Sequence, residues 1–454
     1  MYLKRKIDEY LLEWKEKEER LPLIIKGARQ IGKTESINHF ANQKYGNIVS
    51  INFVLEPKYK TILSDGYAVE DIIKNISMID TSKKFIEGDT LIIFDELQEF
   101  PDIATALKSF KIDGRFDVIC SGSLLGINYR KIHSNSVGYK TDYEMFSMDF
   151  EEFLWAKGYD DSHTEGILDH MKSGKPFSDA EMLVYKRLFL DYCILGGMPA
   201  VVQDYVKTHD IGRTVEIQRN ILDLYRLDIA KYAQDNNKIK IKAIFDSIPS
   251  QLDDKNRRFI LAKVDEKGRM NRYENAFLWL SDAGVALSSY NVNEPQPPLQ
   301  LNEKRSLFKL FMGDTGLLCA ACMENIQFEI LKGNLDVNMG SILENVFAQS
   351  IKSKGFHLNY FESKKYGELD FVVQNGMKVD LLEIKSGNDY KKHSALSKVS
   401  AVENWKFGRK IVFCKGNVQK ENEIEYLPWY MVMFYETEQQ PKEFIYEVDL
   451  SALL

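Results

Sequence analysis

Eight residues near the amino terminus have the types and the spacing that bind phosphate. The segment 27–34 reads GARQIGKT and meets the pattern GxxxxGK[ST]. In such a loop the backbone N–H groups face a polyphosphate, the lysine reaches the β- and γ-phosphates, and the hydroxyl binds Mg²⁺. The pattern therefore predicts a nucleotide and magnesium site formed by Gly27, Ala28, Arg29, Gln30, Ile31, Gly32, Lys33 and Thr34.

An acidic pair follows the third strand-like apolar run of the chain. Asp95 and Glu96 come directly after the residues TLIIF (90–94). The carboxyl end of a buried parallel strand is where α/β sheets bind ligands. We therefore expect Asp95 to hold Mg²⁺, through water, and Glu96 to polarise the attacking water. The alternative is an ordinary acidic helix start, where Asp and Glu are common.

Ser121 directly follows the next apolar run, residues 116–120. The hydroxyl of Ser121 is expected to hydrogen-bond the γ-phosphate or the attacking water, and the alternative is a serine that caps a turn. Lys33, Glu96 and Ser121 are the predicted catalytic residues of an ATP-hydrolysing site.

The elements that must position these residues follow from the same apolar runs. Residues 21–25, 47–54, 90–94 and 116–120 have the composition of buried strands, and residues 36–43 can continue the loop as a helix. Strands that alternate with helices predict an α/β fold, with a doubly wound parallel sheet covered on both faces.

Composition narrows the remaining possibilities. The chain has 454 residues, enough for about two to four domains. Its net charge of −7 argues against a protein that coats nucleic acid or a membrane with its whole surface. Five scattered cysteines indicate no disulfide framework, and no apolar run is long enough to cross a membrane. We expect a cytoplasmic protein that has no membrane partner.

Several segments resemble one known family. GARQIGKT, IIFDELQ and ICSGSLLG are similar to segments of bacterial AAA-type ATPases that carry a C-terminal nuclease-like domain. The resemblance continues through MDFEEFLWA, GGMPAVV, SIPSQL, FKLFMGDTGLL and ELDFVV, so it covers nearly the whole chain. It implies an AAA-type P-loop ATPase core at 1–147, a helical lid at 148–235, a winged-helix domain at 236–335 and a nuclease-like domain at 336–454.

The chain departs from the family at one position. Many relatives have Arg or Lys directly after the glycine at position 138, where this chain has Tyr139 followed by Lys140. A phosphate-contacting role for that basic residue is therefore in doubt here. Arg115 and Arg130 are candidates for an arginine finger, and the alternative for both is an ordinary exposed arginine.

The middle of the chain contains two further patterns. Residues 157–180 are polar and rich in Gly, Ser and Asp, which favours a mobile insertion in the lid. Residues 241–252, 258–264 and 272–284 read as helices, and 285–292 with 306–312 as a hairpin, which is the order of a winged helix. Its basic residues either contact a nucleic-acid backbone or form a solvated face on a protein-binding domain. They are Arg257, Arg258, Lys263, Arg269 and Arg272.

The C-terminal segment has a second group of candidate catalytic residues. Strand-like residues 368–373 and 379–385 flank Asn375-Gly376, a tight-hairpin signal. With those two residues as the loop, Asp370 lies opposite Leu381 and Glu368 opposite Glu383. Because side chains alternate along a strand, one face then carries Glu368, Asp370, Glu383 and Lys385.

This face has the residue types of a Mg²⁺-dependent phosphodiesterase. Asp370 and Glu383 are expected to hold the metal, and Lys385 to orient water or to stabilise charge on phosphorus. The E…D…ExK order resembles the PD-(D/E)XK nuclease fold, with Glu344 on the preceding helix as a further metal ligand. The alternative is an exposed strand whose charged residues simply alternate.

Two functions remain open on this basis. In one, a cytoplasmic ATPase controls a C-terminal nuclease that acts on DNA or RNA. In the other, ATP drives a molecular switch whose C-terminal domains only bind partners. ATP-dependent assembly into a homo-oligomer would distinguish an assembled AAA-type machine from a monomeric switch.

Overall fold

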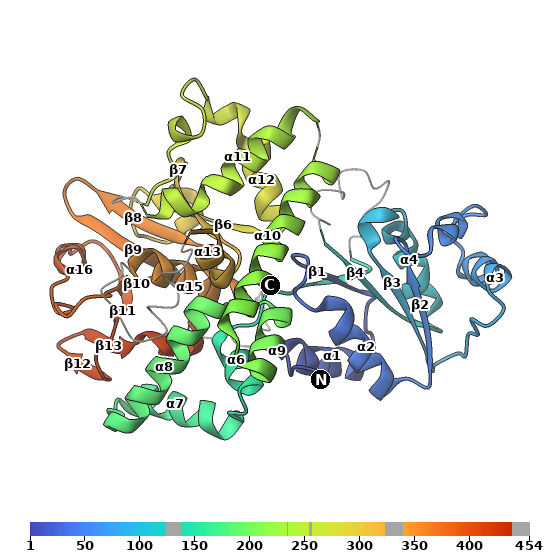
Figure 1. The fold of residues 1–454 in the computed structure, drawn as a ribbon, viewed down its shortest axis with the longest axis horizontal. Coiled ribbons are helices and arrows are strands. Elements are labelled where there is room, and N and C mark those ends of the chain that lie inside the picture. The colour runs from blue at the N-terminus through green and yellow to red at the C-terminus, as the bar shows by residue number, and fades with distance from the viewer. Residues whose placement is uncertain (124–135, 137, 234, 254–256, 323–338, 438–454) are drawn as a thin grey trace, which may run out of the picture.

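The computed structural model describes residues 1–123, 136, 138–233, 235–253, 257–322 and 339–437. Figure 1 shows an amino-terminal lobe and a C-terminal lobe, each built on a sheet, with a group of helices between them. No helix in these described ranges is both long and apolar enough to span a membrane.

The amino-terminal lobe contains a five-stranded sheet in the order β2-β3-β4-β1-β5, and all of its neighbouring strands are parallel. This confirms the predicted parallel α/β sheet. Its strands are β1 (Leu23–Lys26), β2 (Asn47–Asn52), β3 (Thr90–Asp95), β4 (Asp117–Gly122) and β5 (Thr141–Glu144).

Alternating side chains divide this sheet into two apolar faces. Leu23 and Ile25 point to one face and pack with α1 and α2, while Ile24 points to the other and packs with α3 and α4. The short helical turns η1 (Pro57–Thr61) and η2 (Leu97–Glu99) lie in its loops. The covering helices are α1 (Lys6–Glu16), α2 (Lys33–Lys44), α3 (Val69–Ile79) and α4 (Ile103–Asp113).

Helices between the two lobes occupy the segment 148–235 that was expected to be a lid, and we call them the lid helices. They are α6 (Phe150–Ala156), α7 (Asp161–Ser173), α8 (Asp179–Leu195), α9 (Pro199–Thr208) and α10 (Ile211–Tyr232). The next helix, α11 (Asp235–Leu252), spans the first helix expected for the winged-helix unit. The segment 157–180, expected to be a mobile insertion, instead contains the regular helix α7. The Asp160 side chain caps the start of α7, and Gly174 ends it with φ of 68°.

The C-terminal lobe contains an eight-stranded mixed sheet in the order β12-β13-β11-β10-β9-β8-β6-β7. Helix α15 packs on one face of this sheet and α16 on the other. The strands are β6 (Ala286–Val292), β7 (Glu303–Met312), β8 (Asn359–Ser363), β9 (Gly367–Asn375), β10 (Lys378–Ile384), β11 (Phe407–Cys414), β12 (Gln419–Glu421) and β13 (Ile424–Pro428). The helices and helical turns are η4 (Leu261–Lys263), η5 (Met270–Arg272), α12 (Glu274–Asp282), η6 (Leu299–Asn302), α13 (Thr315–Cys322), α15 (Gly340–Ser353), α16 (Ser394–Ser400) and η7 (Trp429–Phe434).

This sheet runs across the expected boundary at residue 335. β6 and β7 form the predicted hairpin, but β6 also pairs in parallel with β8, beginning at Tyr290 and Asn359. The helix expected at 258–264 is only the single turn η4. The predicted winged-helix and C-terminal units therefore share one sheet.

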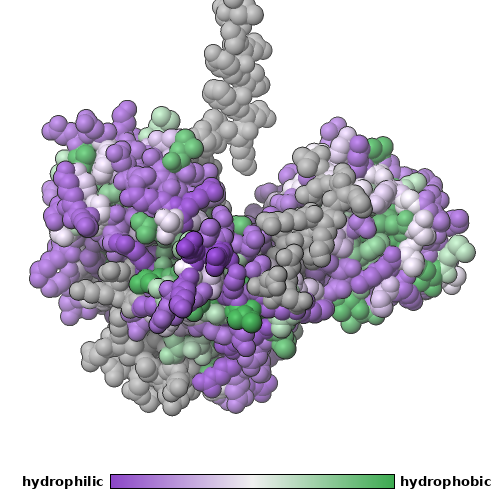
Figure 2. Space-filling model, turned by 90° about the horizontal axis from the view of Figure 1, so that it is seen from above, coloured by the Kyte–Doolittle hydropathy of each residue, from purple (hydrophilic) through white to green (hydrophobic). Residues whose placement is uncertain are grey.

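Figure 2 shows both lobes from above and a largely hydrophilic face.

Two glycine-rich motifs join the lid to this sheet. Asp314, before α13, accepts hydrogen bonds from the backbone N–H groups of Gly197 at 2.8 Å and Leu317 at 3.1 Å. A Cβ on Gly316 would lie 2.2 Å from the carbonyl oxygen of Leu195. The segments GGMP and GDTGLL therefore form a close backbone contact, which explains their glycines through packing.

Candidate functional site

The phosphate-binding loop lies between β1 and α2, at the carboxyl edge of the parallel sheet. Gly27 and Gly32 have φ values of 150° and 92°, which favour glycine. At Gly27 a Cβ would lie 2.1 Å from the carbonyl oxygen of Met145, which follows β5. The loop can therefore pass the segment at Met145 only because position 27 has no side chain.

Lys33 begins α2 and lies against the loop. Its Nζ donates hydrogen bonds to the carbonyl oxygens of Gly27 at 2.9 Å and Ala28 at 2.6 Å. Burial lowers the pKa of this amine to about 8, although the carboxylates of Glu96 and Asp95 oppose the shift. The lysine is thus already inside the loop that would receive a phosphate.

Asp95 is the centre of a polar group at the same edge. Its Oδ2 accepts from the Thr34 hydroxyl at 3.1 Å and from the Asn52 amide at 3.0 Å, while Oδ1 accepts from the Ser121 hydroxyl. The Thr34 hydroxyl and the Asp95 carboxylate are hard oxygen donors that fit Mg²⁺. Ser121 is fully buried in β4 and contacts Asp95, which is a positioning contact.

Glu96 directly follows β3 and has a left-handed backbone, with φ of 58°. Its carboxylate accepts a hydrogen bond from the buried amide of Gln98. The Gln98 amide also lies 3.5 Å from the hydroxyl of Ser123, just beyond β4. Sequence reasoning missed Asn52 and Gln98, although Asn52 lies in the strand-like run 47–54 and Gln98 comes two residues after Glu96.

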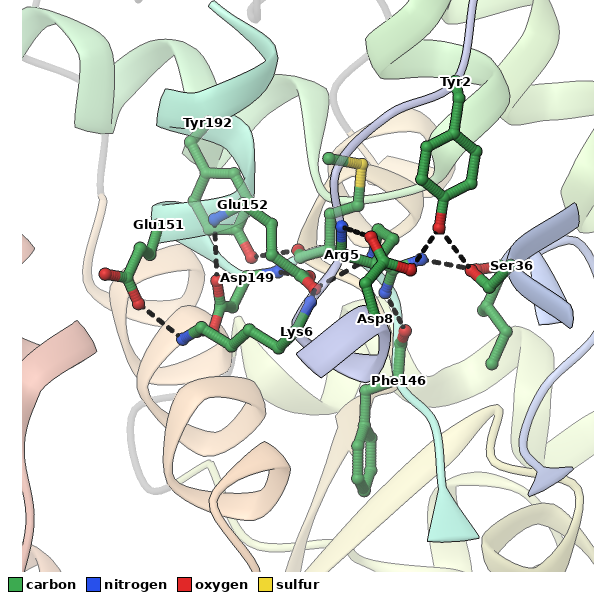
Figure 3. A network of polar contacts seen from close by, with 12 residues as sticks. Tyr2, Arg5, Lys6, Asp8, Ser36, Phe146, Asp149, Glu151, Glu152 and Tyr192 are labelled. Carbon is green, nitrogen blue, oxygen red and sulfur yellow. Dashed lines mark hydrogen bonds and ion pairs between the residues drawn. The ribbon is translucent and has the colours of Figure 1, made fainter. Parts of the chain in front are cut away.

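A buried arginine, Arg5, connects the amino-terminal segment to the loop, and Figure 3 shows it beside Phe146 and Glu152. Arg5 donates to the carbonyl oxygens of Ile31 and Phe146, each at 2.8 Å, and its Nε donates to Glu152 at 3.0 Å. Arg5 is only 5% exposed. Nothing in the local sequence marks Arg5, because its partners lie far along the chain.

The lid and the C-terminal lobe also contact the loop. Arg29 pairs with Asp228 of α10 at 2.5 Å, and the Tyr225 hydroxyl donates to the Arg29 carbonyl at 3.0 Å. At Gly284, which follows α12, a Cβ would lie 3.1 Å from the backbone nitrogen of Ala28. The loop is therefore in contact with three parts of the chain outside its own sheet.

Arg115, one of the two arginine-finger candidates, lies at the edge of the sheet opposite the loop, as the alternative of an ordinary arginine would allow. Arg115 precedes the amino end of β4 and pairs with Asp113, Glu70 and Glu87. Tyr139 and Lys140 precede β5 at that same amino edge, since Leu23 pairs with Thr141. They do not adjoin the phosphate loop. Arg130 lies outside the described residues.

The hairpin of β9 and β10 has a different register from the expected one. Asn375 pairs with Lys378, so the loop is Gly376-Met377, with Gly376 at φ of 57°. Phe371 pairs with Leu382, and continuing that register places Asp370 opposite Glu383. The predicted pairs of Asp370 with Leu381 and Glu368 with Glu383 are wrong by two residues. The predicted shared face is kept, because a shift of two preserves the alternation.

Asp370, Glu383 and Lys385 lie together on this hairpin. Lys385 Nζ lies 2.6 Å from Glu383 Oε1, and Asp370 Oδ2 accepts from the backbone N–H of Ile384 at 2.7 Å. Among the described residues, Glu383 Oε2 is buried without a hydrogen-bond partner. Burial raises the pKa of Glu383 to about 7; Lys385 opposes this shift and Asp370 adds to it.

Glu344 is not part of this group. It is buried on α15, where its carboxylate pairs with Arg257 and with Lys309 of β7, the latter at 3.2 Å. Lys309 also pairs with Glu368 at 2.5 Å. Two cations thus occupy the surroundings of the expected third ligand. No group of three acidic, Cys or His side chains suited to a metal occurs in the described part of the chain.

The basic residues of the middle segment do not form one free surface. Arg257 and Arg258 pair with Glu344 and Glu362, respectively. The side chains of Lys263, Arg269 and Arg272 are exposed. Arg257 and Arg258 are therefore engaged in ion pairs inside the C-terminal lobe, which favours a structural role over phosphate contact for these two residues.

Three family models match parts of the chain. Residues 19–154 match an AAA domain, 186–327 match a domain of unknown function (DUF8612), and 339–432 match a second domain of unknown function (DUF4143). The match at 19–154 covers most of the amino-terminal lobe, so this lobe is similar to AAA domains. No curated protein matches the sequence.

Several solved structures are similar at low sequence identity. A Walker-type ATPase of Pyrococcus abyssi is 13% identical, with 70% of this chain and 96% of that chain covered and a TM-score of 0.42. The ORC1 protein of Aeropyrum pernix, solved in complex with DNA, is 12% identical, with coverages of 72% and 92% and a TM-score of 0.29. RuvB of Thermotoga maritima is 14% identical, with coverages of 62% and 87% and a TM-score of 0.29.

The buried Glu383 makes stability depend on pH. Its folded-state pKa of about 7 exceeds the ordinary value of 4.5, so the folded protein binds this proton more tightly. The stability from this proton is complete below pH 4.5 and is lost as pH rises through 7. Glu383→Gln should therefore exceed wild type in unfolding free energy by up to about 3 kcal/mol at pH 8 and should match it near pH 4.

Urea unfolding in EDTA at both pH values measures this difference. Glu403→Gln, at an exposed position, is the matched control and should show no pH-dependent gain. Equal effects of Glu383→Gln at the two pH values would contradict the burial of an ionisable carboxyl here.

Proposed function

We propose that the protein binds ATP with Mg²⁺ at the loop 27–34 and hydrolyses it. The observation that carries this proposal is the 3.1 Å contact between the Thr34 hydroxyl and Asp95 beside the buried Lys33. These groups come from α2 and β3, and they meet at one edge of the sheet. A glycine-rich turn that occurred by chance would not be expected to place a hydroxyl against a carboxylate such as Asp95.

Each residue has a distinct role in this proposal. Lys33 binds the β- and γ-phosphates, and Thr34 with Asp95 holds the Mg²⁺, which neutralises phosphate charge. Glu96 accepts a proton from water as the water oxygen bonds to the γ-phosphorus and the bond to the bridging oxygen breaks. Ser121 holds the Asp95 carboxylate in place.

We further propose that hydrolysis drives a conformational switch. The contacts of the loop with α10 and with the turn at Gly284 support this, because a ligand in the loop alters the surroundings of both. The C-terminal lobe would then bind a partner in one nucleotide state, with DNA, RNA or a second copy of this chain as the candidate partners.

A metal-dependent nuclease in the C-terminal lobe is the second candidate. Two features favour it: the buried, unpartnered Oε2 of Glu383 and the position of Asp370 opposite it. The position of α15 before the strands β8, β9 and β10 also supports this candidate, because the resemblance places a helix before the sheet. The donors fit a site with two carboxylates, without Glu344, and Lys385 would stabilise charge on a phosphodiester.

Removal of the hydrolytic carboxylate should separate binding from turnover. In Glu96→Gln we expect kcat to fall by about 10²- to 10⁴-fold while ATP affinity stays within about threefold, because the amide cannot accept the proton. Lys33→Ala should instead weaken ATP binding by about 10- to 100-fold, since it removes charge-assisted hydrogen bonds.

Phosphate release and calorimetric titration with MgATP measure the two effects. Glu87→Gln, exposed at the opposite edge of the sheet, is the matched control. Wild-type protein that takes up neither ATP nor GTP at millimolar concentration would end the proposal. Size-exclusion chromatography of Glu96→Gln with and without ATP reports assembly.

The nuclease candidate predicts cleavage that depends on Asp370 and Lys385. With Mg²⁺ or Mn²⁺, we expect Asp370→Asn and Lys385→Met to cut plasmid, single-stranded DNA or RNA about 100-fold more slowly than wild type. Asp389→Asn, at an exposed ion pair with Lys392, should match wild type. The same background in all four proteins would leave the switch as the function of this lobe.

A further inference from the structure

Arg29 makes contacts with the lid that its position in the phosphate loop alone does not require. Its guanidinium pairs with Asp228 of α10 at 2.5 Å, and its backbone carbonyl accepts from Tyr225 one turn earlier. The Arg29 side chain is about one-third exposed, while that of Asp228 is 8% exposed. A single lid helix therefore holds both the side chain and the main chain of this residue.

The surroundings of Arg29 belong to the hydrolytic edge of the sheet. A small cavity there is lined by Arg29 together with Ser123, Asp228 and the turn at 283–285. Ser123 adjoins Gln98, which holds Glu96. Arg29 and Asp228 thus line the same small cavity as Ser123, next to the residues that would activate water.

Phosphoryl transfer is faster with a positive charge beside the γ-phosphate. Negative charge on the γ-phosphate oxygens is compensated in the transition state, and an arginine that does so is worth about 10³- to 10⁵-fold in kcat. Arg115 cannot supply this charge to the site of its own chain, because it lies at the amino edge of the sheet with three carboxylates around it. Arg29 is in the loop that holds the phosphates.

We propose that Arg29 is a built-in arginine finger that Asp228 holds in the nucleotide-free protein and that the γ-phosphate takes over when ATP binds. This inference rests on the proposed ATPase function and deepens it. Arg29 neither gives nor takes a proton: Glu96 accepts the proton of water, and Arg29 compensates charge on phosphate oxygens.

The exchange of partners also explains how the lid would respond to nucleotide. When Arg29 turns to phosphate, Asp228 becomes a buried carboxylate without its cation, which is unfavourable. Burial raises the pKa of Asp228; Arg29 opposes this shift and the nearby Glu96 adds to it, so Asp228 depends on Arg29. Helix α10 must then move, or admit water, to accommodate Asp228. ATP binding would loosen the lid through this one ion pair.

Binding of a transition-state mimic tests the proposal apart from turnover. For Arg29→Ala we expect affinity for ADP with aluminium fluoride to fall by about 100-fold while ATPγS affinity stays within about threefold. The kcat for ATP should fall by about 10³-fold, and Arg29→Lys should recover part of it. Asp228→Asn should raise kcat by about three- to tenfold, because it releases the finger.

Arg115→Ala and Asp223→Asn are the matched controls, the second on the exposed side of the same helix. Thermal melting checks that each variant is folded, and Asp228→Asn keeps the test valid if Arg29→Ala is unstable. Three results would overturn this inference while leaving the ATPase function intact. They are a wild-type kcat in Arg29→Ala, an equal loss of affinity for ATPγS and for the fluoride complex in that variant, and no gain of kcat in Asp228→Asn. Absence of hydrolysis in wild type would instead remove the proposed function itself.

Discussion

The main chain of the phosphate loop is the constraint on which this structure depends. A glycine is required where the loop passes Met145, and Arg5 holds the Ile31 carbonyl from the amino-terminal segment. Tyr225 of the lid holds the Arg29 carbonyl, and the turn at Gly284 lies against Ala28. These contacts join segments that are far apart in the chain. A ligand that changes the loop must therefore affect its neighbours or be resisted by them.

The arrangement of the proposed nucleotide-site residues could be anticipated because its signals are local. The spacing from Gly27 to Thr34 and the acidic pair after an apolar run are contained in short segments, and the structure brings Thr34 and Asp95 within hydrogen-bond distance. Arg5 and Asp228 carry no such signal, since their partners are known only from the fold. The helix α7 was missed because its polar composition resembles a loop, although Asp160 and Gly174 mark its ends.

The C-terminal lobe shows how a small error in a turn changes a site. Asn375-Gly376 predicts a tight hairpin, but the glycine occupies the first loop position, and the register shifts by two. The shift brings Asp370 opposite Glu383, so the pair is closer than expected. Glu344 fails as a ligand for a different reason. Lys309 and Arg257 come from sequence-distant segments and neutralise it.

Hydrogen–deuterium exchange with and without ATPγS and Mg²⁺ is the measurement that tests the coupling of loop and lid most directly. If nucleotide displaces Asp228 from Arg29, exchange slows at residues 27–34 and becomes faster in the last turns of α10, around Tyr225 and Asp228. Slower exchange confined to the loop, with α10 unchanged, would contradict this account, because the lid would then be insensitive to the ligand.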